Sequence, residues 1–207
     1  MKSELVIRLA RSCDTRPAVS LLHQAMGRLG DFFFGNGDPS RTLDILEQLI
    51  ARENNRFSYN FTFLAEKSGQ VIGLLLAYPA GIISRLELST GRHLFPILGW
   101  NGLLNLALRS LPLASCREAE QGEYYISALS VHPRFQGQNV GTRLIRFAEK
   151  EATKRDMHKC SLIVSLENEG ARRLYLRHGY QVVKTKLFSR LLSRSGESGY
   201  QRMVKSL

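Results

Sequence analysis

The stretch SVHPRFQGQNVGTRL, residues 130–144, joins a predicted β-strand to a predicted α-helix. The predicted strand is residues 124–131, and its apolar, aromatic and β-branched side chains suit the interior of a sheet. Pro133 cannot donate a ladder hydrogen bond, so strand pairing should stop there. Gly137 and Gly141 allow backbone amides to approach a ligand closely, and the helix that follows is amphipathic. Unpaired amides and the helix dipole at such a turn favour an anionic ligand.

This turn resembles the acyl-CoA pyrophosphate loop of the GNAT superfamily of N-acetyltransferases, whose pattern is Gln/Arg-x-x-Gly-x-Gly/Ala. Asn139 departs from the pattern, because it stands where the family has its middle glycine. Asparagine tolerates left-handed backbone well, so we expect the loop geometry to be kept. For this stretch alone, a tight turn that binds no ligand is the alternative. The resemblance implies that acetyl-CoA is bound by Gln136, Gly137, Gln138, Asn139, Val140, Gly141 and Thr142.

A second signature, NEGARRLYLRHGY, occupies residues 168–180 and resembles the family pattern Asn-x-x-Ala-x-x-x-Tyr-x-x-x-Gly-Phe/Tyr. The resemblance implies that Tyr175 is the general acid that protonates the departing CoA thiolate. A phenol suits this task because it is neutral near pH 7. The resemblance also implies that Asn168 bonds the pantetheine arm, and Arg172 could reach the adenosine 3′-phosphate. The alternatives are a core tyrosine, a helix-capping asparagine and a solvated arginine.

The strand that ends at Val131 is expected to carry the chemistry. In the family this strand separates from its neighbour, so the N–H groups of Leu129 and Val131 would hold pantetheine and polarise the thioester carbonyl. The acceptor amine must lose a proton to attack, directly or through water. Glu123, at the start of the strand, is the base that the resemblance suggests. The alternatives are Glu118, Glu120 and Tyr125, or an exposed Glu123 with no catalytic role.

The chain is expected to form one α/β domain over residues 1–207, and the resemblance implies the GNAT fold: a mixed central sheet with helices on both faces. Alternation and helical spacing predict the order strand, two helices, hairpin, strand, helix, strand, helix and two strands, which is that of a GNAT domain. An apolar helical insertion at about residues 82–122 stands outside this order. The predicted strands are residues 4–10, 57–65, 71–78, 124–131, 159–165, 180–187 and 199–204, and the first two helices are residues 15–29 and 40–51.

Within the insertion, the apolar residues 94–113 are interrupted by Pro96, Gly99 and several polar residues. These interruptions predict one or two helices with a large apolar face, and they argue against a membrane span. Phe32, Phe33 and Phe34 occupy a predicted loop after the first helix. Apolar surface of this size should be covered. We expect the insertion and the phenylalanines to pack together as a roof over the acceptor site, and a homodimer interface through residues 94–113 is the rival.

The composition, with 43% hydrophobic residues and a mean hydropathy of −0.17, is that of a soluble globular protein. The net charge is +11, and residues 134–207 contain 16 Lys and Arg against 6 Asp and Glu. Coenzyme A or nucleic acid would be attracted there, but no nucleic-acid recognition motif accompanies the charge. Three scattered thiols without metal-ligand spacing, and no visible signal peptide, predict a cytoplasmic protein without a metal or a membrane partner.

The favoured function is transfer of an acetyl group from acetyl-CoA to a primary amine by direct attack in a ternary complex. No Cys or Ser lies in a nucleophile motif that would favour a covalent intermediate. The sequence does not identify the amine acceptor, which is a small molecule or a peptide. The alternative is a non-catalytic acyl-CoA-binding regulatory module of the same fold, which would bind acetyl-CoA and acetylate no amine.

Overall fold

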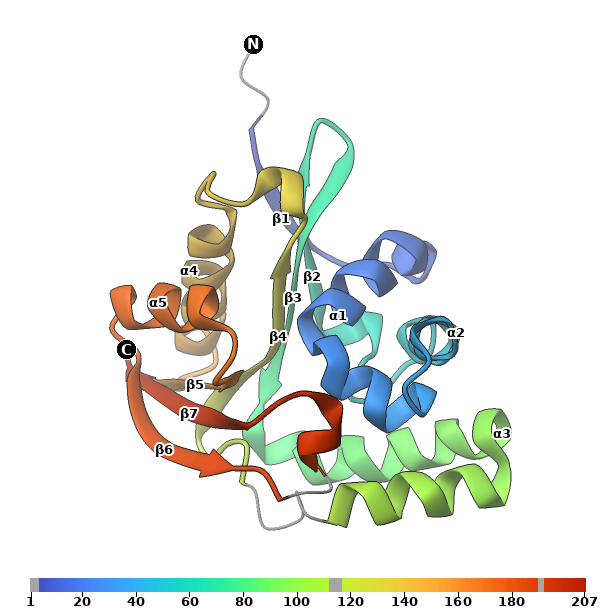
Figure 1. Cartoon of the computed structure of the whole chain (residues 1–207). Helices are drawn as coiled ribbons and strands as arrows, with labels where there is room; N and C mark the ends of the chain where they lie inside the picture. The colour runs from blue at the N-terminus through green and yellow to red at the C-terminus, as the bar shows by residue number, and fades with distance from the viewer. Residues whose placement is uncertain (1–3, 112–116, 190–191) are drawn as a thin grey trace.

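The computed structural model describes residues 4–111, 117–189 and 192–207, and its centre is a seven-stranded sheet (Figure 1). The strand order is β1-β2-β3-β4-β5-β7-β6, and only β4 and β5 are parallel neighbours. This arrangement confirms the mixed sheet expected from the sequence. The strands are β1 (Val6–Leu9), β2 (Thr62–Lys67), β3 (Gln70–Pro79), β4 (Glu123–Val131), β5 (Lys159–Ser165), β6 (Gln181–Leu187) and β7 (Gly199–Ser206).

Helices cover both faces of the sheet. α1 (Thr15–Gly30) and α2 (Pro39–Ile50) lie against one face, and α4 (Val140–Thr153) and α5 (Glu169–Arg177) lie against the other (Figure 1). Each pair of helices buries its apolar stripe on the sheet and forms a separate core. We call the two sides of the sheet the α1 face and the α4 face. The cores include Leu22, Leu46 and Leu64 on the α1 face and Leu144, Ala148 and Ile126 on the α4 face.

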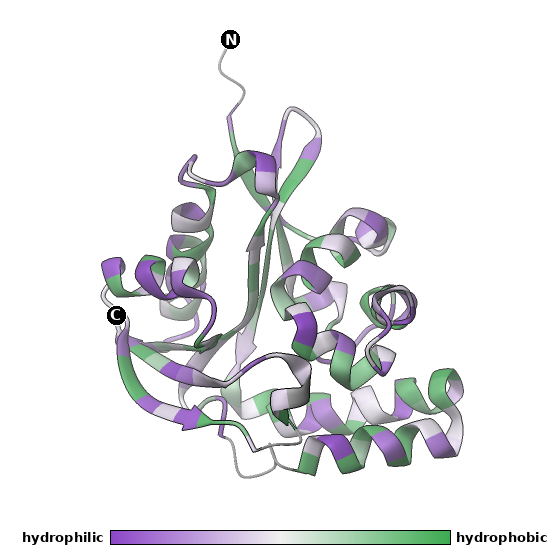
Figure 2. Ribbon diagram, in the orientation of Figure 1, coloured by the Kyte–Doolittle hydropathy of each residue, from purple (hydrophilic) through white to green (hydrophobic). Residues whose placement is uncertain are grey.

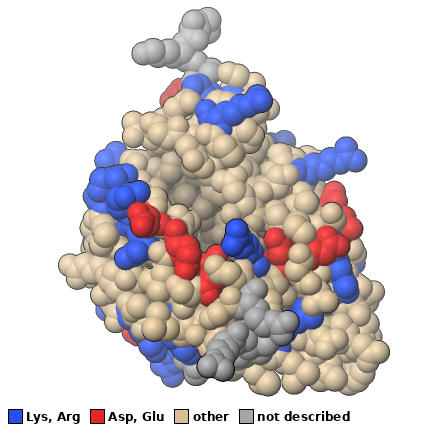
Figure 3. Space-filling model, in the orientation of Figure 1, with Lys and Arg blue, Asp and Glu red and all other residues tan. Residues whose placement is uncertain are grey.

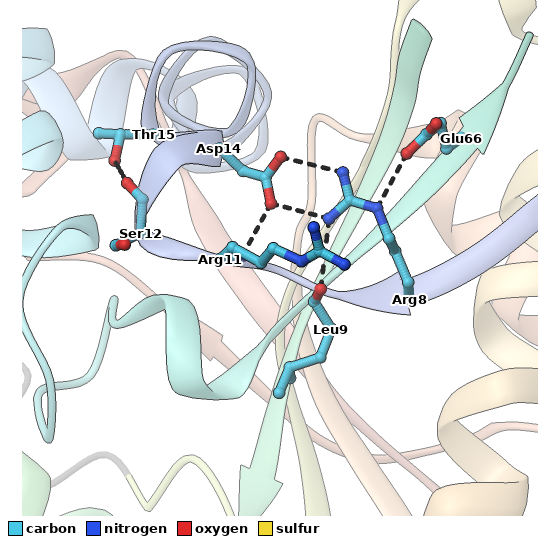
Figure 4. A network of polar contacts seen from close by, with 7 residues as sticks. All are labelled: Arg8, Leu9, Arg11, Ser12, Asp14, Thr15 and Glu66. Atoms are coloured by element: carbon cyan, nitrogen blue, oxygen red, sulfur yellow. Dashed lines mark hydrogen bonds and ion pairs between the residues drawn. The ribbon is translucent and has the colours of Figure 1, made fainter. Parts of the chain in front are cut away.

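Arg8 joins β1 to the start of α1 and to β2 (Figure 4). Its Nη1 and Nη2 donate to the two carboxylate oxygens of Asp14 at 2.7 and 2.9 Å, and its Nε donates to Glu66 at 2.8 Å. A two-point arginine–carboxylate bond has a fixed geometry as well as favourable energy. The same contact lowers the pKa of Asp14 below its ordinary value. The network therefore fixes the direction in which the chain leaves β1 for the α1 face.

The predicted strand at residues 57–65 is wrong in its first half. β2 begins only at Thr62, and Tyr59–Phe61 form a 3-10 turn, with the Ser58 side chain accepting a hydrogen bond from the Asn60 amide. Phe57, Tyr59 and Phe61 nevertheless pack against the core of the α1 face. A turn that directs alternate aromatic rings inward produces the same apolar spacing as a strand, so periodicity could not distinguish them.

The predicted loop that carries the three phenylalanines is also wrong, because Asp31–Gly35 form a π-helical turn that continues from α1. α1 itself is bent at Gly27, whose φ is +55°. His23 on α1 lies 2.7 Å from an Asp31 carboxylate oxygen and ties the turn back to the helix. The turn ends at Asn36 in left-handed backbone.

The segment predicted as an insertion, about residues 82–122, contains α3 (Ile83–Ser110), a helix broken at Gly99, whose φ is +65° and ψ is −177°. Its two arms lie side by side (Figure 1). The first arm places Leu94 in a small core with Ile45 and Leu49 of α2, against which Phe34 packs. On the second arm, Arg109 donates to the Phe32 carbonyl at 3.0 Å. The expected contact between insertion and phenylalanines is confirmed, whereas residues 112–113 of the predicted apolar stretch lie outside the described residues.

Many residues on both arms of α3 are apolar (Figure 2), and some of these side chains are exposed to solvent. Trp100 is 75% exposed, and Leu104 and Leu108 follow it at helical spacing with 55% and 51% exposure. The homodimer through this segment therefore stays a prediction. Within the described parts of the chain, no helix is both long enough and apolar enough to cross a bilayer.

Candidate functional site

β4 and β5 pair only at their beginnings. Their last paired residues are Ile126 and Leu162, although β4 continues to Val131 and β5 to Ser165. The residues on either side of Ser127 pair with consecutive residues of β3, so Ser127 is the extra residue of a β-bulge. A bulge bends and twists the strand that contains it. β4 therefore turns away from β5 at Ser127, and the strands part beyond it.

The backbone groups of Leu129 and Val131 face the opening between β4 and β5. The amide of His132 donates to a β3 carbonyl at 2.9 Å, and backbone groups of successive residues point to opposite edges of a strand. Those of Leu129 and Val131 therefore point away from β3. The Val131 carbonyl already accepts hydrogen bonds from the side chains of Gln24 at 3.0 Å and Gln136 at 3.1 Å. The Leu129 amide is thus directed to where the resemblance expects the thioester carbonyl.

The loop between β4 and α4 has two residues in left-handed backbone, Gly137 with φ of +74° and Asn139 with φ of +61°. The expectation that Asn139 keeps the geometry of a glycine position is confirmed. Arg143 makes the first intrahelical bond of α4, to the Asn139 carbonyl, so the amides before it lie at the open end of the helix. Gly141 lies against α5, since a Cβ there would be 3.1 Å from a Leu174 methyl carbon. The exposed loop suits an anionic group.

Tyr175 projects from α5 into the core of the α4 face, where it is 6% exposed. Val131 and Val140 belong to the same core cluster, so the cluster joins the end of β4, the start of α4 and the tyrosine. Burial raises the pKa of Tyr175 to about 12. The phenol therefore carries its proton near neutral pH.

Further predicted ligands of acetyl-CoA also have protein partners. Asn168 caps α5 by accepting a hydrogen bond from the Ala171 amide at 3.1 Å, as the sequence suggests. Arg172 donates to the side chain of Gln201 at 3.0 Å. Its binding to the 3′-phosphate stays a prediction, and it would require that contact to be shared or broken. The Thr142 hydroxyl lies 3.1 Å from a ring nitrogen of His178, so this contact links the start of α4 to the end of α5.

Glu123, the predicted base, is buried and paired. Both of its carboxylate oxygens lie 2.6 Å from Nη2 of Arg202 on β7, and one also accepts from the Glu120 amide at 2.8 Å. The side chains of Glu123 and Arg202 are only 4% and 7% exposed. Both oxygens of this carboxylate are therefore already occupied by donors from the protein itself. The role of Glu123 as a base stays a prediction, and these contacts do not favour it.

A second polar group lies on the α1 face beside the first half of β4, and we call it the Arg56 cluster: Arg56, Tyr78, Glu118 and Tyr125. Arg56 donates to the Tyr78 hydroxyl at 3.2 Å and to a Glu118 carboxylate oxygen. The Tyr125 hydroxyl also lies beside Glu118. Tyr78 and Tyr125 are 0% and 4% exposed, and their burial raises both pKa values. Both phenols therefore stay protonated at physiological pH.

Carboxylates also gather where β5 ends and the β6–β7 connection returns. The Ser165 hydroxyl oxygen lies 2.7 Å from a Glu167 carboxylate oxygen and also contacts a carboxylate oxygen of Glu197, and the Ser198 amide donates to Glu167 at 2.8 Å. Hydrogen bonds, first that of the Ser198 hydroxyl, lower the pKa of Glu167 to about 2, whereas burial raises the pKa of Glu197. In Figure 3, acidic side chains border a hollow in the middle of the face shown. Negative charge at such a border would attract an amine cation.

The sequence did not indicate the partners of these groups. Arg56 and Glu118 are 62 residues apart, and Glu123 and Arg202 are 79 residues apart, so no local spacing connects them. From the sequence, Tyr125 and Glu118 are alternatives for the base, and no sequence feature indicates Arg56 or Tyr78. Among the residues that the structure describes, no three His, Cys, Asp or Glu side chains are grouped to hold a metal.

Residues 24–180 match the acetyltransferase (GNAT) family. The chain belongs to this family. This GNAT acetyltransferase has no match among the curated proteins. The structure of an N-acetyltransferase from Staphylococcus aureus Mu50 has a TM-score of 0.70 to it at 18% identity, over 97% of this chain and 100% of that one.

Two further structures are similar to the acetyltransferase over nearly their whole length. A Drosophila melanogaster polyamine N-acetyltransferase, which catalyses the formation of N-acetylagmatine, has a TM-score of 0.62 at 17% identity, over 99% of this chain and 100% of that one. The PaiA N-acetyltransferase of Thermoplasma acidophilum, in complex with coenzyme A, has a TM-score of 0.55 at 12% identity, over 99% of each chain. At these identities the likeness establishes the GNAT fold.

Proposed function

We propose that this GNAT acetyltransferase transfers the acetyl group of acetyl-CoA to a primary amine by direct attack in a ternary complex. The observation that carries the proposal is the parting of β4 from β5 after Ser127, next to a left-handed loop that opens α4. The parted strands supply a backbone N–H donor at Leu129, and the loop that follows the end of β4 supplies a site for an anion. Both features belong to the residues that the family resemblance selects.

Acetyl-CoA would lie along the open edge of β4 and supply the acetyl group as a thioester. Backbone amides suit its pyrophosphate better than side chains do here, because the side chains of Thr142 and Asn168 already have partners. The Leu129 amide would donate to the thioester carbonyl oxygen as negative charge develops there. We assign the binding of acetyl-CoA to Leu129, Val131, Gln136, Gly137, Gln138, Asn139, Val140, Gly141 and Thr142, with Asn168 and Arg172 at the α5 end.

Tyr175 is proposed as the acid that protonates the departing thiolate. Its raised pKa keeps the phenol protonated, and a thiolate is basic enough to accept a proton from a neighbouring donor. The Tyr175 ring also packs against Tyr180, with 5.9 Å between the ring centroids, so the side chain has a fixed position. A fixed donor costs little reorganisation when the C–S bond breaks.

A covalent acetyl-enzyme is not part of the proposal. Cys160 is fully buried in the core of the α4 face, and burial raises the pKa of its thiol to about 12, so the reactive thiolate does not form near neutral pH. Cys13 is exposed in the turn before α1, on the other side of the sheet from α4. Cys116 lies outside the described residues.

For the acceptor we propose an amine that is cationic in water. Glu167 and Glu197 place negative charge at the end of β5, where the strands have parted. Two structural neighbours are named for such amines, an agmatine N-acetyltransferase and the polyamine N-acetyltransferase. The roof that α3 and the phenylalanine turn would form over the acceptor is part of the same proposal, because both lie on the α1 face.

The test is a thermal unfolding measurement with acetyl-CoA, followed by a CoA-release assay with agmatine, spermidine, tyramine and a short peptide with a free N-terminus. At 100 times its Kd, acetyl-CoA should stabilise the fold by about 2.7 kcal/mol, or roughly 5–10 °C. CoA should then be released with at least one amine of the panel. Stabilisation without release from any amine would favour the regulatory module instead. No stabilisation at millimolar acetyl-CoA would refute both functions.

A further inference from the structure

We propose that the Tyr125 hydroxyl takes a proton from the acceptor amine while it passes its own proton to Glu118. Tyr125 would be the catalytic residue, and Glu118 and Arg56 would position it. The inference rests on the amine acetylation proposed above. It assigns the proton transfer to the Arg56 cluster and not to Glu123.

The position of Tyr125 in the sheet is the first argument. It lies on β4 directly before the last residue paired with β5, and two residues before the bulge at Ser127. Its side chain belongs to the core of the α1 face, whereas the acetyl-CoA loop, α4 and Tyr175 lie on the other face. An amine that approaches from the α1 face would meet Tyr125 where the strands begin to part.

Ser161 supplies an independent observation at the same place. It is the β5 residue directly beside Tyr125, and in a sheet such neighbours project to the same face. The Ser161 hydroxyl is fully buried, and among the residues that the structure describes it has no hydrogen-bond partner. Buried hydroxyls are rarely left unpaired, so an unpaired one beside a tyrosine marks a place for a polar atom of a ligand. The nitrogen of the acceptor amine would satisfy it.

The partners of Tyr125 give the proton a route to water. The Tyr125 hydroxyl lies beside Glu118, whose side chain is 32% exposed and is held by Arg56. The surrounding groups are Tyr78 on β3, the Arg56 guanidinium, which also contacts Glu87, and Arg202 on β7, which donates to the Glu118 carbonyl. Glu123 offers no comparable route to water, since its side chain is 4% exposed and both its oxygens are bonded to Arg202, whereas Arg56 bonds one oxygen of Glu118.

The step balances as a double proton transfer. One N–H bond of the ammonium breaks and an O–H bond forms on Tyr125, while the original phenolic proton moves to the Glu118 carboxylate. Tyr125 is neutral before and after, so it never persists as a phenolate. The neutral amine then attacks the thioester carbon, the C–S bond breaks, and the thiolate takes a proton from Tyr175. The proton that the new amide nitrogen sheds restores Tyr175 through solvent, and Glu118 returns its proton to water.

The experiment compares Tyr125→Phe and Glu118→Gln with Tyr124→Phe, using the panel amine with the highest kcat/KM. Tyr124 is the matched control, because it is the neighbouring buried tyrosine on the opposite face and its hydroxyl donates to the Ala77 carbonyl at 3.4 Å. At pH 7 we expect kcat to fall by about 10²-fold in Tyr125→Phe and by about tenfold in Glu118→Gln, as for loss of a general base. Tyr124→Phe should stay within about threefold of wild type, and KM for acetyl-CoA should change little.

The pH dependence separates a proton-transfer role from a packing role. The neutral fraction of the amine rises about tenfold per pH unit below its own pKa, so the deficit of Tyr125→Phe should shrink from pH 7 to pH 9.5. A loss of kcat in Tyr125→Phe that is constant with pH, or equal to that in Tyr124→Phe, would overturn the relay. Turnover by the wild-type protein in the same assay would still support amine acetylation. Absence of wild-type turnover would overturn both. If Tyr125→Phe does not fold, the half-exposed Glu118→Gln variant decides by the same pH comparison.

Discussion

Replacement of Arg202 by methionine should destabilise the protein strongly, because it leaves the Glu123 carboxylate buried without a counter-charge. The side chains of Glu123 and Arg202 are 4% and 7% exposed, and 2.6 Å separates their nearest atoms. Removing one partner from a buried ion pair costs about 3–5 kcal/mol. For a chain of this length each kcal/mol lowers the melting temperature by about 2–4 °C. We therefore expect the melting temperature of Arg202→Met to fall by roughly 6–20 °C.

The assay is chemical denaturation at pH 7, with a double variant and a surface control. Glu123→Gln combined with Arg202→Met removes both charges, so its loss of stability should be clearly smaller than that of Arg202→Met alone. Lys154→Met is the control, since Lys154 pairs with Glu151 at 2.8 Å but is 69% exposed. An exposed pair contributes at most about 1 kcal/mol. Arg202→Met should therefore cost several times more than Lys154→Met.

A loss below about 1 kcal/mol in Arg202→Met, or a double variant as unstable as the single one, would refute the argument. The same variants test the role of Glu123. If Glu123 only holds β4 to β7, Glu123→Gln should keep the shape of the wild-type pH–rate profile in the folded fraction. Loss of the acidic limb in that variant would instead make Glu123 the base.

Three further outcomes follow from the site and the fold. Tyr175→Phe should lower kcat by about 10²-fold with little change in acetyl-CoA affinity, and wild-type turnover would mean that the phenol only packs. Asn139→Ala should lower the free energy of unfolding by about 1 kcal/mol and weaken acetyl-CoA binding, because alanine rarely adopts left-handed backbone. Asn139→Gly should retain the stability and the binding of wild type. Equal behaviour of the alanine and glycine variants would contradict this reasoning. Asp14→Asn should cost about 1 kcal/mol at neutral pH. Arg8 lowers the pKa of Asp14 in the folded protein below 3.8, so the stabilisation is complete above pH 3.8 and is lost as the pH falls through the pKa of the folded state. The urea denaturation curves of Asp14→Asn and wild type should therefore converge at a pH below that pKa.

Features that depend on neighbouring residues could be predicted from the sequence. The strand, turn and helix around Gly137 and Asn139 follow from one proline, two residues that accept left-handed backbone and an amphipathic helix. The Asn168 cap and the hairpin at Gly69 are local in the same sense. Periodicity failed where another local structure has the same spacing, as at Tyr59–Phe61, and where a predicted loop is a π-helical turn, as at Asp31–Gly35.

Tertiary structure decided which of the candidate groups are free to react. Glu123 had the right position on its strand to be a base, but a β7 arginine 79 residues away binds both its oxygens. Tyr125 and Glu118 meet because Arg56, 62 residues before Glu118, reaches across the α1 face. Sequence spacing reports contacts within a turn or a strand, where the backbone sets the distance. Contacts between distant segments depend on strand order and packing, so the reactivity of each carboxylate was decided only when β3, β4, β5 and β7 came together.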